Sequence, residues 1–99
     1  MHEHGLAKEL WPQLAKIAES MDLATVTEID MIIGMLHGVS VEFLAHSFEH
    51  AFEGTGFEGA STNITIVDID EQFVHPGTKQ KVTATGWELM VTRMDGQKK

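Results

Sequence analysis

Apolar residues recur at intervals of three and four near the start of the chain, which is the spacing of one face of an amphipathic helix. The residues on this stripe are Leu6, Leu10, Leu14, Ile17 and Met21. The stripe predicts a helix whose apolar face is buried. Pro12 interrupts it, because proline lacks an N–H and its ring crowds the carbonyl group of Lys8. We therefore expect a kink near residues 8 to 12, or a helix that restarts there.

The pattern then changes to strict alternation. In the segment TVTEIDMIIGML, acidic and apolar residues alternate over Glu28, Ile29, Asp30, Met31 and Ile33. This period of two predicts a half-buried strand that ends near Gly34.

A second amphipathic helix is predicted for VEFLAHSFEHAFEG, with Ser40 as its N-cap and Gly54 as its stop. Its apolar face gathers Val41, Leu44, Phe48, Ala51 and Phe52. Its polar face carries Glu42, His46, Glu49, His50 and Glu53. The helix should therefore pack with one side on the core and show the other to solvent.

Two more alternating segments, STNITIVDID and GWELMVTRM, flank the tetrapeptide HPGT. Pro76 and Gly77 occupy the positions that a type II turn favours. A turn there would pair Val74 with Lys79, and the same register sets Ile64 opposite Leu89 and Ile66 opposite Trp87.

Because the apolar faces then agree, we expect a long antiparallel ribbon from about residue 60 to residue 93, with strands at 62–74 and 79–91 and a bulge or bend at Gly86. The predicted fold class is α+β: two helices packed on a small sheet of about three strands, with a long C-terminal antiparallel β-hairpin. Residues 1–99 are expected to form a single domain.

The charge of the chain excludes some partners. Seven Lys and Arg against fifteen Asp and Glu give a net charge of −8, which would repel nucleic acid and anionic lipid. No segment approaches the roughly 20 apolar residues of a membrane span, and the N-terminus lacks the features of a signal peptide. We expect a cytoplasmic protein that binds neither nucleic acid nor membrane.

The 99 residues include no cysteine, so thiolate chemistry and CxxC zinc sites are excluded. Any metal must be held by nitrogen and oxygen. No nucleophile elbow, phosphate loop or dinucleotide fingerprint occurs, and we expect a protein that is not an enzyme.

The first residues, MHEH, offer such nitrogen ligands. Bulky His2 is expected to protect Met1 from trimming, so the free α-amine would belong to Met1. That amine and the His2 amide can close a five-membered ring on a metal, and the amide with imidazole Nδ1 closes a six-membered ring. The fourth ligand could come from Glu3, His4 or a partner. Such nitrogen-rich sites suit Ni(II) or Cu(II); the alternative is a frayed, solvated terminus.

Four more histidines invite a similar question. His46 and His50 lie four residues apart on the predicted helix, close enough to share a metal, with Glu42 and Glu49 nearby. A solvated helix face is the simpler interpretation of the pair. His37 could approach the N-terminal site or face water, and His75 fits a turn residue.

Three ordered segments, MHEHGLA, ATVTEIDMIIGMLHGVS and FEHAFEGTGFEGASTNITI, resemble the hydrogenase nickel-incorporation proteins of the HypA (HybF) family. The matching positions are Met1, His2, Glu3, Ile33, Gly34, Leu36, Gly54, Thr55, Glu58, Gly59 and Ala60. GWELMVTRMD is similar to the closing strand of the family.

The resemblance implies a metallochaperone that binds Ni(II) through the amine of Met1 and His2, with Glu3 contributing. It also implies delivery to the precursor of a nickel enzyme such as [NiFe] hydrogenase, alongside a nickel-handling GTPase. Whether the chain forms a homodimer stays open.

One departure accompanies the resemblance. Members of the family usually insert a zinc domain with two CxxC pairs, where this chain has the cysteine-free segment DEQFVHPGTKQKVTATG. We therefore expect no structural zinc. The alternative to a nickel carrier is a metal-free adaptor of the same fold, whose acidic surface meets a basic partner.

Overall fold

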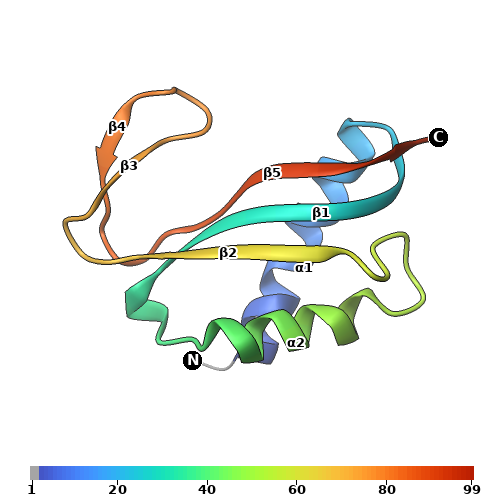
Figure 1. Cartoon of the computed structure of the whole chain (residues 1–99), viewed down its shortest axis with the longest axis horizontal. Coiled ribbons are helices and arrows are strands. Elements are labelled where there is room, and N and C mark those ends of the chain that lie inside the picture. Colours follow the sequence, from blue (N-terminus) through green and yellow to red (C-terminus); the bar gives the residue numbers. More distant parts are fainter. Residues whose placement is uncertain (1–2) are drawn as a thin grey trace.

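The computed structural model describes residues 3–99, with side chains from residue 5 onward (Figure 1). The helical elements are α1 (Glu3–Ser20), the short 3-10 helix η1 (Met35–His37) and α2 (Val41–Phe52). The strands are β1 (Leu23–Gly34), β2 (Ser61–Val67), β3 (Gln72–Val74), β4 (Lys81–Thr83) and β5 (Leu89–Lys98).

Strand β1 is the centre of a three-stranded sheet with the order β2-β1-β5. It pairs in parallel with β2 and antiparallel with β5, so the sheet is mixed. Strands β3 and β4, which follow β2 and precede β5 in the sequence, form a separate two-stranded hairpin. In Figure 1 this hairpin projects beyond the end of the sheet.

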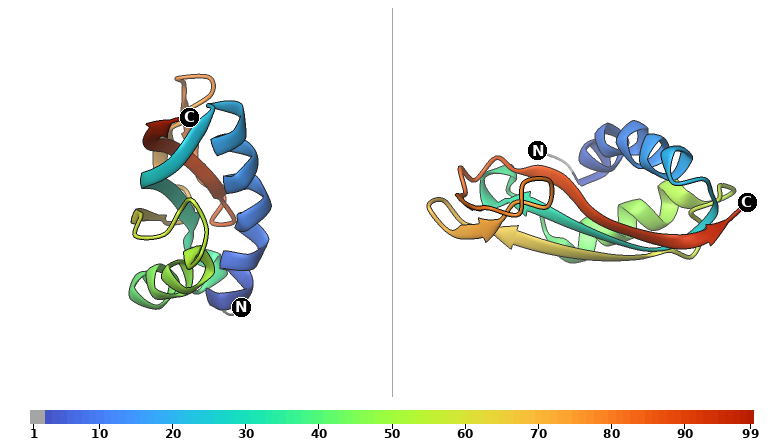
Figure 2. Two further views of the ribbon diagram at one scale, coloured as in Figure 1. Left: turned by 90° about the vertical axis from the view of Figure 1, so that its right-hand side faces the viewer. Right: turned by 90° about the horizontal axis from the view of Figure 1, so that it is seen from above.

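Both helices cover the same face of the sheet, so the protein has two layers (Figure 2). Strand β1 sends Ile29, Met31 and Ile33 into the core, as its alternation predicts. The helices cover them with fully buried side chains, chiefly those of Leu6, Leu10, Leu14, Leu44, Phe48 and Phe52. The predicted α+β class, with two helices on about three strands, is confirmed.

Helix α1 does not restart at Pro12, so that alternative is wrong, while the kink stays a prediction. The helix runs on as one element with Pro12 inside it. Leu10 and Leu14, on either side of the proline, are completely buried. Packing of the apolar stripe therefore outweighs the single helical hydrogen bond that Pro12 removes.

Helix α2 begins and ends close to the predicted residues. The Ser40 side chain accepts a hydrogen bond from the Phe43 N–H at 3.5 Å, and Gly54 follows the helix with φ +75°. Its buried face is narrower than predicted, because Val41 and Ala51 are exposed.

The long ribbon over residues 60–93 is wrong. Strands β2 and β5 do not pair with each other, because β1 lies between them and pairs with both. Met31 of β1 lies between Ile64 and Val91, so Ile64 is not opposite Leu89. Trp87 lies outside the strands and is 60% exposed.

Only the tip of the predicted ribbon exists, and its register differs. Val74 pairs with Lys81 rather than with Lys79. The turn closes through the Lys79 N–H and the His75 carbonyl at 2.8 Å, one residue longer than a type II turn. Lys79 itself takes a left-handed conformation with φ +63°, so it belongs to the turn, and pairing begins at Lys81.

The end of β1 makes a close backbone approach to the predicted bend at Gly86. The Gly34 N–H donates to the Glu88 carbonyl at 2.8 Å, and the Leu36 N–H donates to the Gly86 carbonyl at 2.8 Å. Gly86 has φ +92°, which confirms the bend. A β-carbon on Gly34 would overlap the carbonyl group of Gly86.

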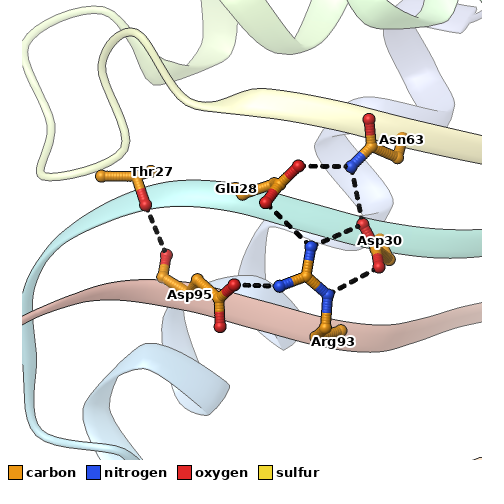
Figure 3. A network of polar contacts seen from close by, with 6 residues as sticks. All are labelled: Thr27, Glu28, Asp30, Asn63, Arg93 and Asp95. Atoms are coloured by element: carbon orange, nitrogen blue, oxygen red, sulfur yellow. Dashed lines mark hydrogen bonds and ion pairs between the residues drawn. The ribbon is translucent and has the colours of Figure 1, made fainter.

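On the open face of the sheet, Arg93 of β5 lies among three carboxylates (Figure 3). Its Nε donates to Asp30 at 2.7 Å, and its other nitrogens contact Glu28 at 2.8 Å and Asp95. Asn63 of β2 donates to Glu28 at 2.9 Å and to Asp30 at 2.7 Å. The network joins all three strands, and the hydrogen bonds from Arg93 and Asn63 lower the pKa of Glu28 and of Asp30.

Gly34→Ala should reduce the free energy of unfolding by about 3 kcal/mol, because the added methyl group meets backbone that cannot move aside. Gly5→Ala is the matched control: the exposed helical Gly5 has open space around it, and alanine there should add about 0.5 to 1 kcal/mol. Urea unfolding measures both. An equal effect of the two substitutions would contradict the close approach.

Arg93→Gln should lower the melting temperature at pH 7, because it leaves the carboxylates of Glu28, Asp30 and Asp95 without their cation. The lowered pKa values of Glu28 and Asp30 contribute stability above the ordinary carboxyl pKa, and this stability is lost as the pH falls through the lowered values. The deficit of the variant should therefore shrink in acid. Lys81→Gln, which removes the same charge from the hairpin, should show no such pH dependence in melts followed by circular dichroism.

Candidate metal centre

The predicted nickel ligands lie at the edge of what the structure describes. Met1 and His2 fall outside the described residues, as does the side chain of Glu3. The backbone of Glu3 is described and forms the first residue of α1. The first turn of α1 lies beside α2 (Figures 1 and 2).

The position of Glu3 has a chemical consequence. The N–H groups in the first turn of an α-helix have no carbonyl partner within the helix. Because Glu3 opens α1, its amide nitrogen is one of these groups. Loss of the proton from this amide would therefore break no hydrogen bond of the helix.

His46 and His50 are brought together on the solvent side of α2. Their Nε2 atoms lie 3.1 Å apart, and the two rings are perpendicular with their centroids separated by 4.6 Å. The side chains are 65% and 56% exposed, respectively. The predicted proximity of the two rings is confirmed, and both are open to solvent.

A carboxylate lies against the outer nitrogen of each ring. Nδ1 of His46 is 3.8 Å from Glu49 Oε2, and Nδ1 of His50 is 3.2 Å from Glu53 Oε1. Sequence spacing predicted Glu49 correctly but missed Glu53 and suggested Glu42 instead. The spacing of three residues, which repeats in both pairs, is the signal that could have found Glu53.

His37 does not simply face water. Its Nε2 lies 3.1 Å from the carbonyl oxygen of Trp87, and its ring meets the edge of the Trp87 ring at a centroid distance of 5.5 Å. Because a carbonyl oxygen only accepts hydrogen bonds, the Nε2 of His37 carries a proton. His37 thus fastens η1 to the segment before β5.

His75 is a turn residue, as predicted. Its Nδ1 accepts a hydrogen bond from the Gly77 N–H at 3.1 Å, and its carbonyl closes the turn to Lys79. Its N–H also donates to the Gln80 carbonyl at 2.9 Å, so His75 fastens both sides of the turn.

Among the side chains of residues 5–99, no group of three or more His, Asp or Glu converges in a way that could hold a metal ion. The His46–His50 pair therefore supplies two ligands rather than a closed site.

Within residues 3–99, no helix is long and apolar enough to cross a membrane.

Comparisons with known proteins point to one family. Residues 1–83 match the family described as hydrogenase/urease nickel incorporation, metallochaperone, HypA. The chain is 30% identical to the hydrogenase maturation factor HypA of Nitrosospira multiformis over 96 residues, which is 97% of this chain and 81% of that protein. The solution structure of the Ni metallochaperone HypA from Helicobacter pylori is similar in fold, with a TM-score of 0.67, 14% identity and full coverage of both chains.

Proposed function

This chain belongs to the HypA family of nickel-incorporation metallochaperones, and from that premise we propose that it binds Ni(II) at its N-terminus and delivers the ion during the maturation of a nickel enzyme. The ligands would be the amine of Met1, the amide and imidazole of His2, and a donor from Glu3. A [NiFe] hydrogenase precursor is the expected recipient, and a nickel-handling GTPase the expected helper, in the cytoplasm.

The observation that carries the proposal is the family match, which begins at residue 1 and so includes the MHE start. The start of α1 at Glu3 supports it, because the Glu3 amide is spared from helical hydrogen bonding. The net charge of −8 supports it as well, since an acidic protein attracts cations.

The segment between β2 and β5 bears on the handling of zinc. Where the family was expected to carry its zinc domain, this chain has the β3-β4 hairpin and no cysteine. We propose that the chain folds without zinc, and that partner contacts made through the zinc domain elsewhere in the family do not apply to it.

Titration of the full chain with NiCl₂ should show about one tightly bound ion, with affinity that rises steeply between about pH 6 and 8 as amine, imidazole and amide lose their protons. Two changes test the ligands. His2→Ala removes the imidazole, and acetylation of the Met1 amine keeps every side chain but removes the amine as a ligand. Each should weaken binding by at least about 100-fold, as measured by calorimetry.

These titrations are made on a chain that also carries His50→Ala, so that the exposed imidazole pair does not contribute to Ni(II) binding. Intact-mass analysis establishes that the amine is that of Met1. Tight binding that survives acetylation of the Met1 amine would contradict the chelate. A complete lack of Ni(II) binding by the unmodified N-terminus would favour the metal-free adaptor.

Chelator treatment tests the independence from zinc. EDTA should leave the melting temperature of protein purified without added metal unchanged, because the core consists of apolar side chains and zinc thiolate ligands are absent. A fall of several degrees would show a structural metal. If EDTA no longer lowered the melting temperature of His46→Ala, the metal would be assigned to the imidazole pair.

A further inference from the structure

We propose that His46 and His50 form a second metal site, a two-imidazole chelate for Ni(II) on the outer face of α2. This site shares no residue with the N-terminus and does not rest on the function proposed above. Three observations carry it: the distance between the two Nε2 atoms, the carboxylates behind the rings, and the exposure of the pair.

The distance fits a shared metal. With metal–nitrogen bonds of about 2.1 Å, two nitrogen atoms 3.1 Å apart subtend an angle of roughly 95° at the metal. This angle is close to the right angle between neighbouring ligands in octahedral and square-planar coordination, which Ni(II) adopts. A tetrahedral ion would need the nitrogen atoms slightly further apart, so the pair needs little adjustment to accept Ni(II).

A carboxylate near the second nitrogen of each ring favours the tautomer that a metal requires. A metal-ligating histidine usually donates its other N–H to a carboxylate, which fixes the tautomer and increases the basicity of the ligand nitrogen. Glu53 lies 3.2 Å from Nδ1 of His50, and Glu49 lies 3.8 Å from Nδ1 of His46. Both Nδ1 atoms thus face negative charge, and both Nε2 atoms face each other.

Without metal, the two Nε2 atoms share one hydrogen bond, so one ring carries its proton on Nε2. Moving this proton to Nδ1, next to the carboxylate, frees the second nitrogen as a ligand. The exchange needs a change of tautomer and a rotation of the exposed rings, because the metal lies off the line that joins the two nitrogen atoms. The pair is therefore arranged to accept a cation without a rearrangement of the helix.

The surroundings favour a cation and leave it open to exchange. Glu49 and Glu53 also line a groove between α2 and residues 59–62, and the other residues lining it are uncharged. Since no third His, Asp or Glu of the described chain joins the pair, the remaining coordination positions fall to water or to a donor from another molecule. Such a site binds more weakly than a closed one and can pass its ion on.

The test uses the full chain carrying His2→Ala, which removes the imidazole arm of the N-terminal chelate, and titrates it with NiCl₂ by calorimetry. We expect one ion per chain. His46→Ala and His50→Ala should each weaken binding by at least tenfold, and the double variant should bind no worse than either, because one substitution already destroys the chelate. His75→Asn, which removes a histidine but retains a side-chain acceptor for the turn, should change affinity by less than twofold.

Two further readouts separate a chelate from independent surface histidines. Paramagnetic Ni(II) should broaden the NMR signals of both His46 and His50 at substoichiometric metal and leave those of His75 sharp. Glu53→Gln should weaken binding more than Glu42→Gln, which removes the same charge from the same helix. Equal effects of these two glutamate variants would overturn the orienting role of Glu53. Unchanged affinity in His46→Ala or His50→Ala would overturn the site.

Discussion

The fold depends on β1 being paired on both of its edges. This strand of 12 residues has hydrogen-bonded neighbours on both edges, β2 on one side and β5 on the other, with register shifts on the β5 side. Its two side-chain faces are therefore what meets the rest of the molecule. One face presents Ile29 and Met31 to the helices, and the other presents Glu28 and Asp30 to Arg93. A slip by one residue would exchange the two faces, burying carboxylates and exposing the core. Register is thus fixed from both sides of the sheet at once.

Local patterns predicted the elements of this fold but not the order of the strands. Ser40, Gly54 and the alternation around Ile29 are short-range signals, and each marked its helix or strand well. The apolar faces of β2 and β5 agree with each other because both pack against the same core, whether or not the two strands touch. Alternation of period two fits any even register, so it could not reveal that β1 lies between them. The restart of the helix at Pro12 was wrongly predicted for a related reason. The tertiary packing that keeps α1 continuous is not visible in the local sequence.

Contacts in the candidate sites were also predictable from the sequence only where the residues lie close together along the chain. Helical periodicity brought His46 and His50 together, because their proximity depends only on a spacing of four residues. The role of Trp87 as the acceptor for His37 depends on two segments 50 residues apart, and no local signal predicts it. The Arg93 network also joins residues from three strands, so it appears only once the strand order is known. The imidazole pair within one helix was predicted, and the contacts across the sheet were not.

The β3-β4 hairpin has a consequence for how such a chain can change in evolution. Its base is clamped by hydrogen bonds from Asp70 to Ala84, from Ala84 to Glu71 and from Gly34 to Glu88, while its tip points away from both layers (Figure 1). Residues can be gained or lost at the tip without altering the pairing of β1. A whole module could therefore enter or leave at this point in a single genetic event, and the same point offers a place to graft a fluorescent or affinity tag.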